Sequence, residues 1–144
     1  MKTGFLFCYC LLYAIVIGHF FNIGSDYFNI KHETTPNFSS RNEEFLLAVI
    51  IAPIIETVIY QLILYKLFEF LNFKQNWHYT IAMSFVFSQF HWYSWIYVLM
   101  VFFNSLGLNY FYVKTFKTKG ASSAFFLTVM LHSLYNLYGF LFVT

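Results

Sequence analysis

Five long apolar runs divide this chain, near residues 4–22, 44–68, 79–93, 95–113 and 121–143. A helix needs about 20 apolar residues to cross the hydrocarbon core of a membrane. Only 10% of the residues are charged, whereas a soluble domain carries roughly 25%. So few charges cannot cover a water-exposed surface, and lipid must cover it instead. The sequence therefore predicts an all-α, polytopic transmembrane helix bundle of about five spans, in which the short run 79–93 forms a tight hairpin with the next run through His91–Trp95.

The polar stretch 23–43 separates the first apolar run from the others. It contains Gly24 and Pro36 among many polar residues, which is typical of a loop. The first run has no Ala-x-Ala-like cleavage site before this loop, so we interpret it as a retained anchor. We expect a single membrane domain over 1–144, with an anchor helix and an extracytoplasmic loop in 1–43 and a catalytic helix core in 44–144. Ser40 or Asn42 is expected to cap the second helix.

Basic residues segregate when five spans are assumed. One side of the membrane then carries Lys31 and Arg41, and the other carries six lysines: Lys2, Lys66, Lys74, Lys114, Lys117 and Lys119. By the positive-inside rule the N-terminus is cytoplasmic and the C-terminus extracytoplasmic, with a bacterial inner membrane as the expected location. The net charge of +2 and the lack of a basic patch argue against a nucleic-acid partner. Membrane lipid is therefore the partner that composition predicts.

One carboxylate stands deep inside an apolar run, and this residue is Glu56. A carboxylate at membrane depth is costly and therefore indicates a functional site. Two later runs carry His91 and His132, and Asn136 follows His132 by one helical turn. At about 1.5 Å of rise per residue, Glu56 and His91 each lie about 18 Å from a helix end, and His132 lies about 16 Å from one. All three therefore fall near the middle of the membrane, on separate helices.

These residues resemble three motifs of the CAAX-protease and bacteriocin-processing family of intramembrane endopeptidases, which is related to the type II CAAX prenyl endopeptidases. Glu56 matches the first Glu of Glu-Glu-x-x-x-Arg after a Pro-containing apolar run. Phe87 and His91 match Phe-x-x-x-His, and His132 and Asn136 match His-x-x-x-Asn. The resemblance covers roughly residues 48–140. It implies an enzyme that hydrolyses a peptide bond of a membrane-associated substrate.

The resemblance implies that Glu56 activates a water molecule. In that mechanism His91 helps to hold the water, while His132 and Asn136 are placed on one helix face to stabilise the oxyanion. Thr57 and Gln61 stand where the family motif has its second Glu and its Arg. Replacing both partners of a buried ion pair is nearly neutral. We expect Thr57 and Gln61 to hydrogen-bond to each other and, with Phe87, to support the site.

Three alternatives stay open at this point. Glu56, His91 and His132 are also a possible zinc ligand set, since two imidazoles and a carboxylate with one open position are typical of catalytic zinc. The absence of His-Glu-x-x-His favours a metal-free glutamate mechanism over this zinc site. A second alternative is a non-catalytic immunity or maturation partner on a protease-like scaffold, suggested by Thr57 and Gln61. The third is a small haem- or metal-binding membrane protein that uses His91 and His132.

Overall fold

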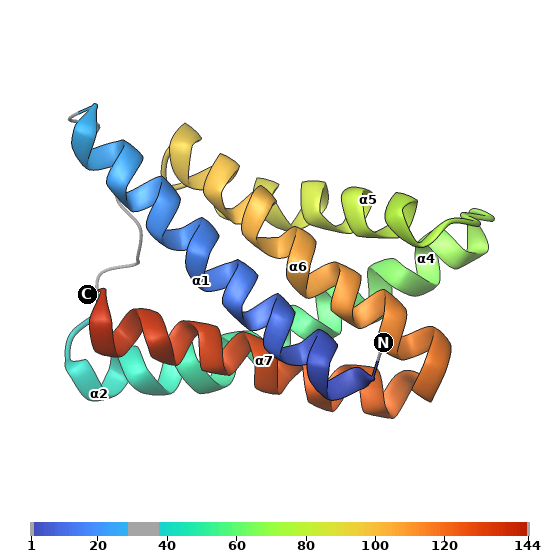
Figure 1. Cartoon of the computed structure of the whole chain (residues 1–144). Helices are drawn as coiled ribbons and strands as arrows, with labels where there is room; N and C mark the ends of the chain where they lie inside the picture. Colours follow the sequence, from blue (N-terminus) through green and yellow to red (C-terminus); the bar gives the residue numbers. More distant parts are fainter. Residues whose placement is uncertain (1, 29–37, 144) are drawn as a thin grey trace.

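The computed structural model describes residues 2–28 and 38–143, and these residues form helices and short connections without a strand (Figure 1). Lys31 and Pro36, which fall in the expected loop, lie outside the described residues. The first helix is α1 (Thr3–Tyr27). Five consecutive helical segments then form one continuous rod: α2 (Arg41–Glu44), η1 (Phe45–Ile51), α3 (Ala52–Glu56), η2 (Thr57–Ile63) and α4 (Leu64–Phe70). The remaining helices are α5 (Asn76–Gln89), α6 (Trp95–Lys119) and α7 (Ala121–Phe142). The segments η1 and η2 are π-helical, with wider turns than an α-helix.

Four of the described helices are long and apolar enough to cross a membrane: α1, the rod Arg41–Phe70, α6 and α7. The fifth, α5, has only 14 residues, a length of about 21 Å by the usual helical rise. It is therefore shorter than a hydrocarbon core of about 30 Å. The predicted helical bundle is confirmed, with α5 as a short helix that packs against α6. Helix α1 also extends to Tyr27, so residues 23–27 are helical where the sequence predicted a loop.

Helix ends follow local rules of capping. The Ser40 hydroxyl accepts a hydrogen bond from the Glu43 backbone N–H at 3.2 Å and begins the rod, as the sequence predicted. Ser94 caps α6 in the same way through the Tyr97 N–H. Gly120 ends α6 with a φ of 84°, a left-handed conformation that favours glycine. The single-residue connection at Gly120 makes α6 and α7 antiparallel neighbours.

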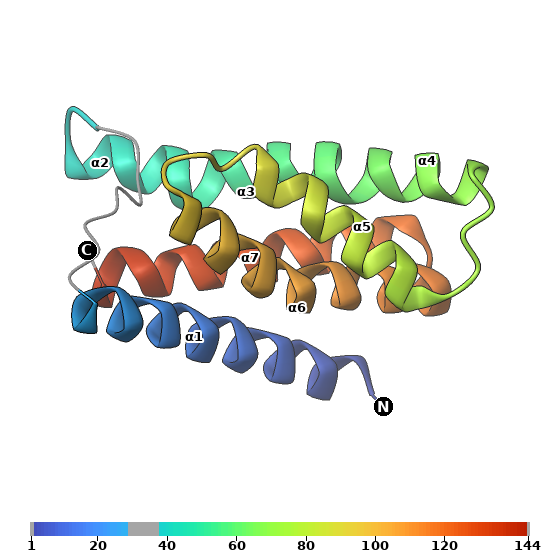
Figure 2. The same ribbon diagram turned by 90° about the horizontal axis from the view of Figure 1, so that it is seen from above.

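Lysines gather at one end of the bundle. The rod ends there, α5 begins there and α6 ends there, beside the N-terminus, whereas α7 ends at the opposite end (Figures 1 and 2). The Lys117 ammonium donates to the Asn76 side-chain oxygen at 2.7 Å, and Lys66 lies 4.9 Å from the centre of the Phe116 ring. Arg41 begins the rod at the other end. We call these two ends of the bundle the lysine end and the α2 end.

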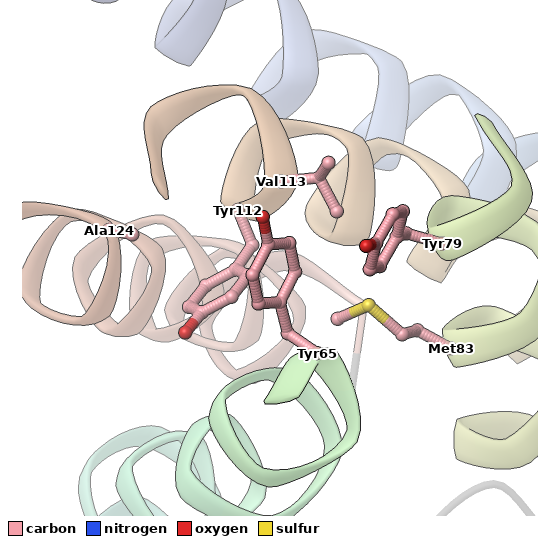
Figure 3. Close-up of a cluster of buried hydrophobic side chains, with 6 residues drawn as sticks. All are labelled: Tyr65, Tyr79, Met83, Tyr112, Val113 and Ala124. Atoms are coloured by element: carbon pink, nitrogen blue, oxygen red, sulfur yellow. The ribbon is translucent and has the colours of Figure 1, made fainter. Parts of the chain in front are cut away.

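A cluster of buried aromatic side chains closes the lysine end. It joins α4, α5, α6 and α7 through Tyr65, Tyr79, Met83, Tyr112, Val113 and Ala124 (Figure 3). The rings of Tyr65 and Tyr79 stack at 4.8 Å, and the Tyr79 hydroxyl donates to the Phe73 carbonyl at 2.7 Å. Each such aromatic pair contributes about 0.5–1.5 kcal/mol beyond the area it buries. Side chains therefore fill the space between the helices at the lysine end.

Helix α1 lies against α6 through close backbone contacts. The Tyr13 hydroxyl donates to the Phe103 carbonyl at 2.9 Å, and the Asn104 amide donates to the Ala14 carbonyl at 3.2 Å. A Cβ atom on Gly107 would lie 2.7 Å from the Tyr13 ring, so this approach requires glycine. The other side of α1 exposes large apolar side chains such as Phe5 and Phe20. This apolar side is suited to contact with lipid.

Candidate active site

Glu56 is the last residue of α3, between the two π-helical segments of the rod. The Ala52 N–H reaches back five residues to the Leu47 carbonyl, as a wide turn requires. The next carbonyl, that of Ala48, would by the same spacing need an N–H from Pro53, which has none. The Asn136 side-chain amide donates to this carbonyl at 2.8 Å. Pro53 thus leaves a backbone acceptor about two helical turns before Glu56, and α7 supplies its donor.

The Glu56 carboxylate lies between two imidazoles. Its Oε1 is 3.7 Å from Nε2 of His91, and its Oε2 is 3.7 Å from Nε2 of His132. These distances exceed the 2.7–3.2 Å typical of a direct N–H···O hydrogen bond, and a shared water would lie beside each pair of atoms. The exposed fractions of the three side chains are 22% for Glu56, 16% for His91 and 9% for His132. The three groups therefore meet at a site that is largely, though not fully, shielded.

His91 lies in the turn between α5 and α6, because α5 ends at Gln89. The predicted hairpin through His91–Trp95 is confirmed, but the prediction that His91 lies within a membrane helix is wrong. The backbone N–H of His91 bonds the Ser88 carbonyl, and the chain then turns toward α6. Its Nδ1 is 2.8 Å from the Phe87 carbonyl. Since a carbonyl only accepts, Nδ1 is the donor, and in the neutral imidazole Nε2 then carries the lone pair. That lone pair faces Glu56 and can accept a proton from a shared water.

Phe87 also supports the site with its ring. The ring centre lies 4.4 Å from that of His91 and 6.1 Å from that of His132. Phe87 is itself buried and packs against Tyr60 at 5.1 Å. One aromatic side chain thus contacts both histidines from α5.

His132 and Asn136 share one face of α7. The Nδ1 atom of His132 is buried and has no hydrogen-bond partner among the described residues. No protein group therefore fixes its tautomer, and Nε2 is free to carry the proton. Asn136 uses one N–H on the Ala48 carbonyl and keeps a second N–H and its carbonyl oxygen. Two donors are thus available one helical turn apart.

One cavity of about 570 Å³ is lined by all four candidate catalytic residues, Glu56, His91, His132 and Asn136. It extends from Glu56 to the α2 end of the bundle, where Glu43, Glu44 and Phe140 border it. Tyr93, Tyr97, Asn104 and Tyr135 also line the wall. The lysine end is filled by the aromatic cluster, so the cavity leads from the site toward the opposite end.

Thr57 and Gln61 are buried away from this cavity. The Gln61 amide donates to the Asn109 side-chain oxygen at 3.0 Å, and the Asn109 amide donates to the Ser84 hydroxyl at 2.9 Å. The predicted hydrogen bond between Thr57 and Gln61 is wrong, since Thr57 Oγ1 has no partner among the described residues. Gln61 turns toward α6 instead, where Asn109 offers an acceptor. This network ties the rod to α5 and α6 behind Glu56.

Sequence reasoning missed Asn109, Ser84 and the Ala48 carbonyl. Asn109 is a polar residue inside an apolar run and gave a usable signal, because an amide at membrane depth seeks an interhelical partner. The Ala48 carbonyl gave none, since it becomes available only through the π-helical turn before Pro53. Among the residues that the structure describes, no three His, Cys, Asp or Glu side chains form a group that could hold a metal ion. Zinc on Glu56, His91 and His132 stays an untested prediction.

Comparisons with known proteins point to one family. The model of the type II CAAX prenyl endopeptidase Rce1-like family matches residues 43–138. No curated protein and no solved structure matches the chain. The matched part covers more than half of the chain, and it contains the four candidate catalytic residues Glu56, His91, His132 and Asn136. The chain thus belongs to the type II CAAX prenyl endopeptidase Rce1-like family of membrane proteases.

Proposed function

We propose that this protein hydrolyses a peptide bond of a membrane-associated substrate, with Glu56 as the base that activates water. One observation carries the proposal: each oxygen of the Glu56 carboxylate faces the Nε2 atom of a different histidine at 3.7 Å, on the wall of a substrate-sized cavity. A water beside Glu56 and His91 would donate one proton to the carboxylate oxygen and the other to the Nε2 lone pair. Membership of a protease family agrees with this chemistry.

The reaction follows from these positions. Glu56 takes a proton from the water, and the hydroxide adds to the carbonyl carbon of the scissile bond. Negative charge then develops on the carbonyl oxygen, and the His132 Nε2–H and the free Asn136 N–H are the donors for it. The tetrahedral intermediate collapses as the C–N bond breaks, and Glu56 passes its proton to the leaving amine. The products are a peptide carboxylate and a peptide amine.

Hydrolysis in isotopically labelled water tests the proposal directly. The purified protein in lipid nanodiscs is mixed with a membrane-tethered peptide in H₂¹⁸O, and the products are analysed by mass spectrometry. We expect one ¹⁸O atom in the new carboxyl group of the N-terminal product. Cleavage without ¹⁸O in that product, or no cleavage of any peptide in a broad library, would contradict the proposal.

Chelation separates the two versions of the mechanism. If Glu56 activates water without a metal, dialysis against EDTA or 1,10-phenanthroline is expected to leave the cleavage rate within about twofold. A chelator acts by removing a bound metal ion, so it does not slow a reaction that uses no metal. Strong inhibition that Zn²⁺ reverses would instead assign Glu56, His91 and His132 as zinc ligands. A known zinc protease in the same nanodiscs serves as the positive control.

We also propose that the lysine end faces the cytoplasm of a bacterial cell, because basic residues favour that side of the inner membrane. Lys74 lies in the connection at the lysine end, and Ser39 lies at the α2 end. The native Cys8 and Cys10 are free thiols and are replaced first. In intact spheroplasts, a membrane-impermeant thiol reagent is then expected to label Ser39→Cys and to spare Lys74→Cys. A tag fused after Thr144, which lies outside the described residues, should be extracytoplasmic as well.

Labelling of Lys74→Cys and not of Ser39→Cys would reverse this orientation. Lysed membranes are the control, because both cysteines should react there.

A further inference from the structure

Helix α1 forms a wall of the active-site cavity although it precedes the matched residues 43–138. Ala14, Ile15, Gly18, His19 and Asn22 all line the cavity. The helix is held in place at two points beside it. Asn104 of α6 donates to the Ala14 carbonyl at 3.2 Å, and the His19 Nε2 atom lies 2.6 Å from the Tyr138 hydroxyl of α7. Helix α1 is therefore more than an anchor.

Gly18 of α1 faces the Tyr135 side chain of α7 at close range. A Cβ atom on Gly18 would lie 2.9 Å from the Tyr135 hydroxyl oxygen, closer than real Cβ contacts come. The nearest ring carbons of Tyr135 would be 3.8 Å away, which is ordinary contact. Only the hydroxyl oxygen, at the far end of the Tyr135 side chain, would have to shift to make room for a side chain at position 18.

Tyr135 is well placed to influence the reaction. It precedes Asn136 in sequence, follows His132 by three residues and lines the same cavity. Asn104, whose amide holds α1 through the Ala14 carbonyl, lines the cavity together with Tyr135. The phenol ring therefore lies at the cavity wall, where α1 meets α7.

We propose that Gly18 is a specificity-determining residue, because it lets Tyr135 lie against α1. With Tyr135 in that position, the space beside Asn136 stays free. This space receives the substrate side chain next to the scissile bond. The inference rests on the proposed function of the site. A larger residue at position 18 displaces the Tyr135 hydroxyl from α1. The empty space that Tyr135 borders is the cavity, so the ring moves into the volume that a bulky substrate side chain needs.

The test compares two peptides that differ only in the residue before the cleaved bond, Ala in one and Phe in the other. In Gly18→Ala the ratio of kcat/KM for the Phe peptide to that for the Ala peptide is expected to fall by about 10-fold or more, the range for a misfit in an apolar pocket. Most of the change should be in KM for the Phe peptide. Gly24→Ala on the same helix is the matched control, since nothing lies within 4 Å of its added Cβ.

A second substitution tests the contact itself. Tyr135→Phe removes only the hydroxyl oxygen, so Gly18→Ala combined with Tyr135→Phe is expected to recover the wild-type ratio. An unchanged ratio in Gly18→Ala, or an equal loss for both peptides that Tyr135→Phe does not rescue, would overturn the inference.

Binding of the same two peptides is also measured in a Glu56→Gln background, where cleavage is not required. The Gly18→Ala change should there weaken binding of the Phe peptide relative to the Ala peptide. If wild type cleaves neither peptide but this binding ratio still shifts, the proposed function fails and the role of Gly18 stands. If the binding ratio does not shift, the role of Gly18 fails by itself.

Discussion

Glu56→Gln is expected to abolish peptide cleavage and to leave the protein folded. Glutamine has nearly the shape of glutamate and still hydrogen-bonds, but its amide cannot take a proton from water. In the wild type each Glu56 oxygen lies 3.7 Å from a histidine Nε2 atom. In the variant the glutamine side-chain amide occupies the same position, so both histidines keep a polar neighbour. Loss of a general base costs about 10²–10⁴ in rate, and here the same group also returns the proton to the leaving amine. Initial rates with a membrane-tethered peptide, together with thermal unfolding in detergent, measure both effects.

Glu69→Gln is the matched control for this change. Glu69 lies on the same rod, where its carboxylate pairs with Lys66 at 2.8 Å, but it is exposed and remote from the cavity. Its replacement should leave cleavage unaltered, since exposed ion pairs contribute little. Cells provide a second readout. If Glu56→Gln supports the in vivo function as well as wild type, the protein acts as a non-catalytic partner on a protease-like scaffold.

Asn136→Ala is expected to lower kcat by about 10²–10³, the range for a lost oxyanion donor. The same change removes the donor to the Ala48 carbonyl. A buried carbonyl without a partner costs about 1–3 kcal/mol, so Asn136→Ala should also lower the free energy of unfolding. Two effects are thus mixed in one variant, and both are measured, by steady-state kinetics and by denaturant unfolding.

Pro53→Ala separates the two effects of Asn136. Alanine at position 53 supplies the backbone N–H that proline lacks, at the spacing the Ala48 carbonyl needs in the π-helical turn. The combination of Pro53→Ala with Asn136→Ala should therefore regain stability while kcat stays low. Recovery of kcat together with stability would show that Asn136 acts only on the backbone of the rod, and it would remove Asn136 from the oxyanion site.

The apolar runs were sufficient to predict the helical bundle, because lipid demands helices and leaves few other solutions. They also predicted the hairpin through His91–Trp95, but not that α5 ends at Gln89, before His91. Phe90 continues the apolar run past that end, and α6 begins at Trp95 with Ser94 as its cap. Composition does not register where a helix gives way to a turn, since aromatic residues suit both a helix and a membrane interface.

The site was predictable only in part. Glu56, His91 and His132 stand out as polar residues in apolar runs, and the structure places them together. The partner of Gln61 was not predictable, because Asn109 lies 48 residues further along and meets it through the packing of α6. The close approach of Tyr135 to Gly18 is a tertiary contact of the same kind, because a glycine in an apolar helix does not by itself indicate which side chain packs against it.

The uneven filling of the bundle implies that its resistance to opening is uneven too. At the lysine end, separating the helices means unpacking the aromatic cluster around Tyr65. At the α2 end, the cavity occupies the space that buried side chains fill elsewhere, so a local separation there breaks less structure. Proteins open in cooperative units whose free energies differ in this way. We therefore expect the closed end to act as a fixed base while the helices part at the α2 end, without unfolding the rod that holds Glu56 or the helix α7 that holds His132.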